Sequence, residues 1–356
     1  MTLATPIGAR ACGVCRTELS GSLLACPSCG ALVHSRELKA LAEEGAVAEK
    51  ADDVTRALSA WRRALDLLPQ SSAQHAKVLE KVQTLSRRIR APAALGARAP
   101  AVRTERRGLG KWLALAAATG ALLLKFKAIP LFLLGKGKLL LLGLTQAKTF
   151  FSMAISVGVY ALAFGWWFAL GLVVSIYIHE MGHVAALRLY GIPASAPMFV
   201  PGLGAFVRLK QRPATPAEDA RVGLAGPIWG AFAALASLLL GKAYDVPVLV
   251  AIGSVGAMVN LFNLLPVWQL DGARAFSALA KPERVVVVVV LWVLALYARD
   301  FTLFLLALVA TGRVLVADAN APTVGDRGVL ATFIVVAVGL TLVMTSAGEL
   351  AALTAP

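Results

Sequence analysis

The first thirty residues lack the apolar core and cleavage site of a signal peptide, because cysteine pairs and turn residues occupy them. The N-terminus is therefore expected to stay in the cytosol. Acidic residues are also scarce, with 20 Asp and Glu against 35 Lys and Arg and a formal net charge of +15. Much of the basic excess lies before and at the first apolar run, in residues 87–90 and 98–111. This placement predicts positive-inside anchoring at a membrane rather than binding of nucleic acid.

Residues 111–356 contain repeated apolar runs with few charges, which predicts a mainly α, polytopic membrane protein of about six to eight transmembrane helices. Residues 112–147 are ambiguous, because lysines and Pro130 interrupt the apolar pieces, so they could be short spans or an interfacial segment. The basic loop 188–221 predicts that the preceding span ends on the cytosolic side. The expected spans are 149–165, 167–189, 222–241, 247–265, 285–298, 301–316 and 329–347.

All four cysteines lie in two Cys-x-x-Cys pairs near the N-terminus. Each pair can supply two thiolates, so Cys12, Cys15, Cys26 and Cys29 together can hold one tetrahedral Zn²⁺. Two disulfides are the alternative, but a small cytosolic domain without its own core needs a metal more. We therefore expect a structural zinc ribbon over residues 1–34. Its single arginine between the pairs and its lack of interleaved aromatics argue against nucleic-acid binding.

Residues 35–90 show helical periodicity and are expected to form a helical hairpin, with Pro69 as a helix stop. The spacing of Ala57, Trp61, Ala64 and Pro69 resembles the second helix of a tetratricopeptide repeat, and Gly45 fits the first helix. A plain helical hairpin is the alternative. Either one predicts binding of a cytosolic protein partner through residues 1–90, and residues 91–110 are expected to be a basic linker.

Ionisable side chains inside an apolar helix are costly and are functional by default. The stretch 175–191 carries the pattern H-E-x-x-H, formed by His179, Glu180 and His183. On a helix, two histidines four residues apart share one face and can bind one Zn²⁺, with the glutamate beside the open coordination position. A polar cluster satisfied by neighbouring helices is the bland alternative.

A catalytic zinc usually has three protein ligands, so two histidines leave one ligand missing. The best candidate is Asp271, an acid beside a turn glycine directly after another apolar span. Pro266 should break or kink that span and free backbone groups that Asn263 and water could satisfy. The sequence thus predicts a metal site closed by two membrane helices.

The stretches HEMGH and NLLPVWQLDG together resemble the two signature motifs of the site-2 protease family of intramembrane zinc metalloproteases. Asn263, Pro266, Leu270, Asp271 and Gly272 fill every defined position of the second motif. The resemblance covers about residues 150–275, the core of a metalloprotease domain expected over 111–356. It implies His179, His183 and Asp271 as zinc ligands and Glu180 as the catalytic acid and base.

Two further segments look like that family. Gly226 and Pro227 match its G-P-x-x-N element, although Gly230 stands where asparagine is common, which leaves Asn263 as the candidate for holding the substrate carbonyl. Residues 197–210 resemble the hairpin or re-entrant loop that follows the H-E-x-x-H helix, and could pair with an extended substrate; a plain connecting loop is the alternative.

The sequence therefore predicts a multi-pass enzyme of the cell membrane that hydrolyses peptide bonds within or near transmembrane segments, the reaction of regulated intramembrane proteolysis. It predicts one catalytic Zn²⁺ and one structural Zn²⁺, with the lipid bilayer and a transmembrane protein substrate as partners. The alternative is a metal transporter or an inactive protease-like scaffold. A transporter would be expected to place more histidines and acids along its other spans than this sequence does.

Overall fold

The computed structural model describes residues 10–19, 23–89, 147–202, 204–207, 211, 213–316 and 321–353. The chain divides into two compact units. The first unit takes in Met1–Arg90 together with Leu187–Pro193 and Gln211–Glu218, and the second unit holds the remainder. The predicted linker 91–110 and the ambiguous residues 112–146 lie outside the described residues.

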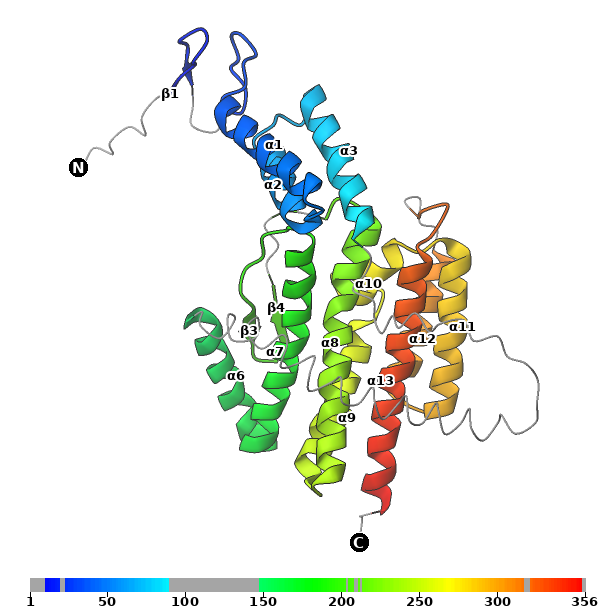
Figure 1. Ribbon diagram of the computed structural model, residues 1–356. Helices are drawn as coiled ribbons and strands as arrows, with labels where there is room; N and C mark the ends of the chain where they lie inside the picture. The colour runs from blue at the N-terminus through cyan, green and yellow to red at the C-terminus, as the bar shows by residue number, and fades with distance from the viewer. Residues whose placement is uncertain are drawn as a thin grey trace. The chain divides into compact units, whose positions relative to one another are not determined.

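The first unit begins with a small antiparallel ribbon of β1 (Arg10–Ala11) and β2 (Glu18–Leu19). Three helices follow, α1 (Ser35–Lys50), α2 (Val54–Asp66) and α3 (Ala73–Arg88), where the sequence predicted a helical hairpin (Figure 1). Side-chain caps start the last two helices, because Asp53 accepts from the Arg56 amide and Ser72 from the His75 amide.

Gly45 explains how closely α1 and α2 pack. A Cβ at this position would lie 2.6 Å from the indole of Trp61, which is 8% exposed. Glu49 fixes the same edge of the indole by accepting its N–H at 2.7 Å. Gly45 and Trp61, two of the residues that suggested a tetratricopeptide repeat, therefore contact one another: the indole occupies the space that a larger residue at position 45 would need.

Two segments from later in the chain complete the first unit. Tyr190 and Ile192 are almost fully buried, and a Cβ on Gly191 would lie 2.6 Å from the amide nitrogen of Ser59. The buried guanidinium of Arg62 donates to the Tyr190 carbonyl at 2.9 Å and forms a very short ion pair with buried Glu218. Thus α2 packs on the chain that follows the H-E-x-x-H motif.

The second unit is built from apolar helices. Their bounds are α6 (Ala147–Phe164), α7 (Trp166–Leu189), α8 (Pro216–Ala243), α9 (Pro247–Asn263), α10 (Asp271–Ser277), α11 (Lys281–Ala298), α12 (Phe301–Leu315) and α13 (Arg327–Leu353). In this unit α9 packs against α13, and α11 packs against α12 and α13 (Figure 1). Between α7 and α8 a short antiparallel hairpin joins β3 (Met198–Val200) to β4 (Gly204–Phe206).

Local sequence signals set several helix ends in this unit. Gly165, with φ of +82°, separates α6 from α7. Pro247 stands in the first turn of α9, where its missing N–H costs nothing. Asp300 caps α12 by accepting from the amides of Thr302 and Leu303, and Asp326 caps α13 in the same way.

The predicted class, a polytopic α-helical membrane protein with a small cysteine ribbon, is confirmed. Four described helices are long and apolar enough to cross a membrane, namely α6, α7, α8 and α13, with mean hydropathies between 1.4 and 2.3. The helices α9 and α12 are apolar but shorter. Each predicted span from 149 onward coincides with a helix, although α8 begins at Pro216 rather than at residue 222.

Candidate metal centre

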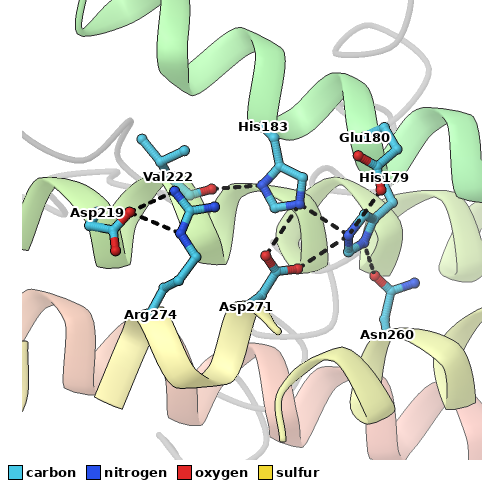
Figure 2. A network of polar contacts seen from close by, with 8 residues as sticks. All are labelled: His179, Glu180, His183, Asp219, Val222, Asn260, Asp271 and Arg274. Carbon is cyan, nitrogen blue, oxygen red and sulfur yellow. Dashed lines mark hydrogen bonds and ion pairs between the residues drawn. The ribbon is translucent and has the colours of Figure 1, made fainter. Parts of the chain in front are cut away.

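His179, Glu180 and His183 lie on the second half of α7, and all three are buried, with 5 to 7% of each residue exposed. One helical turn separates the two imidazoles, so their Nε2 atoms lie 3.2 Å apart. Figure 2 shows both rings directed toward the same point. The arrangement that the sequence predicted for H-E-x-x-H is present.

Asp271, the first residue of α10, reaches the same point from another part of the chain (Figure 2). Its Oδ2 lies 3.2 Å from His179 Nε2 and its Oδ1 lies 3.4 Å from His183 Nε2. The helix before it ends at Asn263, because Pro266 cannot continue it, as the sequence predicted. A Cβ at Gly272 would overlap the Leu264 carbonyl, so only glycine permits the tight turn that delivers the aspartate.

Hydrogen bonds to the far nitrogens fix how each imidazole is protonated. His183 Nδ1 lies 2.8 Å from the Val222 carbonyl, which can only accept, so Nδ1 carries the hydrogen. His179 Nδ1 lies 2.7 Å from Oδ1 of Asn260. Both Nε2 atoms are then left with free lone pairs that face each other and the aspartate.

This donor set fits a tetrahedral zinc ion. Zn–N and Zn–O bonds of about 2.0 to 2.2 Å place neighbouring ligands of a tetrahedron about 3.3 Å apart. The three separations between the nitrogens and the aspartate oxygens are 3.2, 3.2 and 3.4 Å. Lone pairs held this close repel one another unless a cation lies between them. Glu180 Oε1, 4.0 Å from His179 Nε2, stands beside the set.

Small residues of α8 make room for the cluster. A Cβ on Gly226 would overlap His183 Nε2 and would lie 2.7 Å from His179 Nε2. A Cβ on Gly182 of α7 would overlap the Ala225 carbonyl, so glycine lets the two backbones approach. Gly226, the glycine of the G-P pair that the sequence singled out, thus lies against the site, and Pro227 follows it within α8.

An ion pair braces the aspartate-bearing helix against α8. Arg274, one turn after Asp271, donates from Nε and Nη2 to Oδ1 of Asp219 at 2.9 and 2.8 Å (Figure 2). The guanidinium is 18% exposed and the carboxylate 32%. Since Val222 also lies on α8, the same helix orients His183 and holds α10 in place.

The four cysteines form a second group that could hold a metal. Their sulfurs all lie within 4.8 Å of one another, with Cys12 and Cys29 3.6 Å apart and Cys15 and Cys26 3.5 Å apart. All four are free thiols, so the alternative of two disulfides is not what the structure contains. A tetrahedral zinc with Zn–S bonds of about 2.3 Å requires sulfurs about 3.8 Å apart. Hydrogen bonding to Thr17 lowers the pKa of the Cys15 thiol to about 6, which favours the thiolate.

Asn263 is the asparagine that the sequence motif names, whereas Asn260 is the asparagine that contacts His179. Asn263 ends α9 and is half-buried, and its role toward a substrate stays a prediction. Asn260, one turn earlier and 3% exposed, makes the hydrogen bond to His179, and sequence reasoning did not name it. The available signal was an amide within an otherwise apolar helix.

Residues 167–246 match the family model described as Peptidase family M50. This stretch runs from the second residue of α7 to the residue before α9, and it therefore contains His179, Glu180 and His183. The resemblance to site-2 proteases that the two motifs carried is confirmed at the level of this family. Asp271 lies beyond the matched residues.

The chain is also similar to zinc metalloprotease MJ0392 of Methanocaldococcus jannaschii, with 26% identity over 117 residues. The similarity covers 32% of this chain and 34% of that protein, so the chain spans about a third of the length of the relative it matches. Together the two findings support a membrane zinc metalloprotease at the level of the family.

Proposed function

We propose that this protein is an intramembrane zinc metalloprotease, which hydrolyses peptide bonds within or near transmembrane segments of other membrane proteins. The observation that carries the proposal is the buried meeting of His179, His183 and Asp271, with ligand atoms 3.2 to 3.4 Å apart and Glu180 beside them. These three residues would hold the catalytic zinc. Cys12, Cys15, Cys26 and Cys29 would hold a structural zinc.

Each residue of the site has a distinct task. A zinc ion supplies Lewis acidity and makes water acidic enough to react near neutral pH. The Glu180 carboxylate takes a proton from the attacking water at one oxygen and later gives it to the nitrogen of the leaving amine. Val222 and Asn260 keep the histidine Nδ1 atoms protonated, so that both Nε2 atoms remain ligands.

The substrate must present an unwound peptide bond, because a helical carbonyl is already bonded one turn along its own helix. Helix-weakening residues near the cleavage point are therefore expected. The β3–β4 hairpin supports a place for the extended strand, since in the described part of the chain β4 pairs only with β3. Phe206 on β4 is 45% exposed and offers an apolar contact.

A metal transporter is a weaker account of the same ligands. Transit would need further buried acids or histidines along a path, but among the described residues the buried acids outside the site are limited to Glu218. Glu218 is already paired with Arg62 in the first unit. The proposal therefore assigns the ligands to one fixed reaction site.

The proposed location is the cell membrane with the N-terminus in the cytosol. The basic residues around the loop 188–221 support this orientation. Residues 1–90 would then be free to bind a cytosolic protein partner or a substrate tail in addition to packing against segments of the same unit.

The test compares the purified wild type with Glu180→Gln on a tagged single-span substrate in vesicles. The amide cannot accept the proton, so turnover should fall by about 10²- to 10⁴-fold while bound zinc is unchanged. Glu43→Gln is the control, because it makes the same change at an exposed acid of α1 outside the site. Cleavage by Glu180→Gln at the wild-type rate would refute the assignment of the base.

A further inference from the structure

We propose that Asn260 is the positioning residue for His179 and that Gly230 is the residue whose missing side chain gives Asn260 its place. The inference rests on the proposed metal site and concerns how one of its ligands is oriented. It also reassigns the polar contribution of this region from α8, where a family motif would put an asparagine, to α9.

The direction of the Asn260 amide follows from its two partners. Its Nδ2 donates to the Gly256 carbonyl at 2.7 Å, one turn back on the same helix. A carbonyl cannot donate, so Nδ2 must face it and Oδ1 must point the other way, toward His179 Nδ1 at 2.7 Å. Nδ1 then carries the hydrogen, and the lone pair stays on Nε2, the atom 3.2 Å from Asp271.

Burial makes this contact decisive for His179. Asn260 is 3% exposed and His179 is 5% exposed, so water does not compete for either group. Without the amide, the ring could turn or carry its hydrogen on Nε2, and either change would remove a metal ligand. Partners of this kind change metal affinity by about 10- to 100-fold.

Gly230 is matched to the amide. A Cβ built at Gly230 would overlap Oδ1 and Nδ2 of Asn260 and would lie 2.5 Å from its Cγ. Nearly the whole amide therefore occupies the space that any other residue at position 230 would fill. Glycine on α8 and asparagine on α9 form a complementary pair, and changing one should affect the other.

The two histidines differ in a way that makes the pair testable. His183 is oriented by the backbone carbonyl of Val222, which no substitution removes. His179 is oriented by a side chain, which can be removed. A variant at position 260 should therefore disturb one ligand and leave the other in place.

The experiment measures zinc affinity of the full-length protein in detergent by competition with a chelator, and the absorption spectrum of the Co²⁺-substituted protein. Subtracting the spectrum of His183→Ala isolates this site from the cysteine site. Asn260→Ala should bind zinc about 10- to 100-fold more weakly and shift the Co²⁺ bands. Asn260→Asp, which keeps an acceptor oxygen, should restore most of the affinity.

Gly230→Ala completes a double-mutant cycle. In the wild-type background it should weaken zinc binding about as much as Asn260→Ala, because its methyl group displaces the amide. In the Asn260→Ala background it should have no further effect, since the space is then empty. Equal losses in both backgrounds would overturn the pairing, and wild-type affinity and spectrum in Asn260→Ala would overturn the positioning role.

These outcomes are separate from the proposed function. A wild-type protein that binds zinc at this site but cleaves no membrane substrate would refute the proposed protease activity. The double-mutant cycle would still test the positioning role, because it measures zinc affinity and Co²⁺ spectra rather than cleavage. A wild type whose zinc content equals that of His183→Ala would refute the metal site itself, and the positioning role with it.

Discussion

The cysteine group and the histidine–aspartate group, the two proposed metal sites, are built in opposite ways. The cysteines come from one short stretch, and Cys15 and Cys29 remain exposed. The other three ligands come from α7 and α10, and all are at least nine-tenths buried. Four thiolates would complete a tetrahedron, whereas two imidazoles and a carboxylate leave a fourth position open beside Glu180.

The difference supports the proposed structural role of the cysteines and the proposed reactive role of the buried group. A closed set of ligands close in sequence can fold a small ribbon around its metal. An open set needs rigid surroundings, and here glycines, an amide and an ion pair with two hydrogen bonds supply them. The first three predictions below test whether the two groups act independently, and they run from the largest expected effect on turnover to the smallest.

Asp271→Ala removes the ligand that closes the buried set. Turnover should fall by about 10³-fold or more, since several kcal/mol of charge stabilisation depend on the metal. Metal analysis should show one zinc per chain fewer, with the ribbon zinc retained. Glu43→Ala, which removes an exposed carboxylate of α1, is the control and should keep both zinc ions. Full zinc content in Asp271→Ala would contradict the assignment of the third ligand.

Gly226→Ala tests the surround rather than a ligand. The added methyl group would push on both imidazoles, and a shift of about 1 Å in a reacting group can cost about 10²-fold in rate. Turnover and zinc affinity should fall together. Gly339→Ala is the matched control, because a Cβ at that position of α13 meets nothing within 4 Å. An unchanged rate in Gly226→Ala would mean that α7 and α8 can move apart without loss of activity.

Local signals in the sequence were enough to predict most helices and the close grouping of the residues in both candidate metal sites. Hydrophobic runs predicted α6 to α9 and α11 to α13 but not the short α10, and short spacings predicted the cysteine set and the histidine pair, because those contacts lie within one segment. Asp271 required a second motif, since nothing near His183 in sequence supplies the third ligand. The sequence thus indicated the candidate ligands better than the residues that orient them.

The residues that orient the candidate ligands are determined by which helix faces pack together, and a local stretch of sequence does not contain that information. The partnership of Asn260 with Gly230, and of Arg274 with Asp219, joins residues on different helices without any regular spacing. The same holds for Arg62 and Glu218, which no periodicity connects. In the sequence, each of these residues appears only as a polar residue in an apolar stretch or as a small residue in a helix. Neither kind of signal indicates which residue of another helix is the partner.

Cys12→Ser should remove the ribbon zinc and leave the buried site intact. The ribbon should become sensitive to limited proteolysis, because metal binding and folding of so small a domain are coupled. Turnover on a substrate without a cytosolic tail should not change. Ser28→Ala serves as the control within the ribbon, since it leaves all four sulfurs in place. A large fall in turnover would show that the two groups are not independent.

Arg62→Met tests the stability of the first unit rather than catalysis. Arg62 and Glu218 are 4% and 1% exposed, and burial lowers the pKa of the guanidinium while the carboxylate opposes that shift. Removing one partner leaves an unpaired buried charge, which costs about 3 to 5 kcal/mol. Thermal unfolding followed by proteolysis of residues 35–89 should report the loss.

Arg56→Met is the matched control for that change, because the Arg56–Glu44 pair is 62% and 35% exposed and should contribute at most about 1 kcal/mol. Adding Glu218→Gln to Arg62→Met should recover part of the stability, since the double variant buries no unpaired charge. If Arg62→Met and Arg56→Met had equal effects, the packing of α2 on the segments 187–193 and 211–218 would not depend on this ion pair. That packing would then depend on other contacts, among them those of the buried Tyr190 and Ile192.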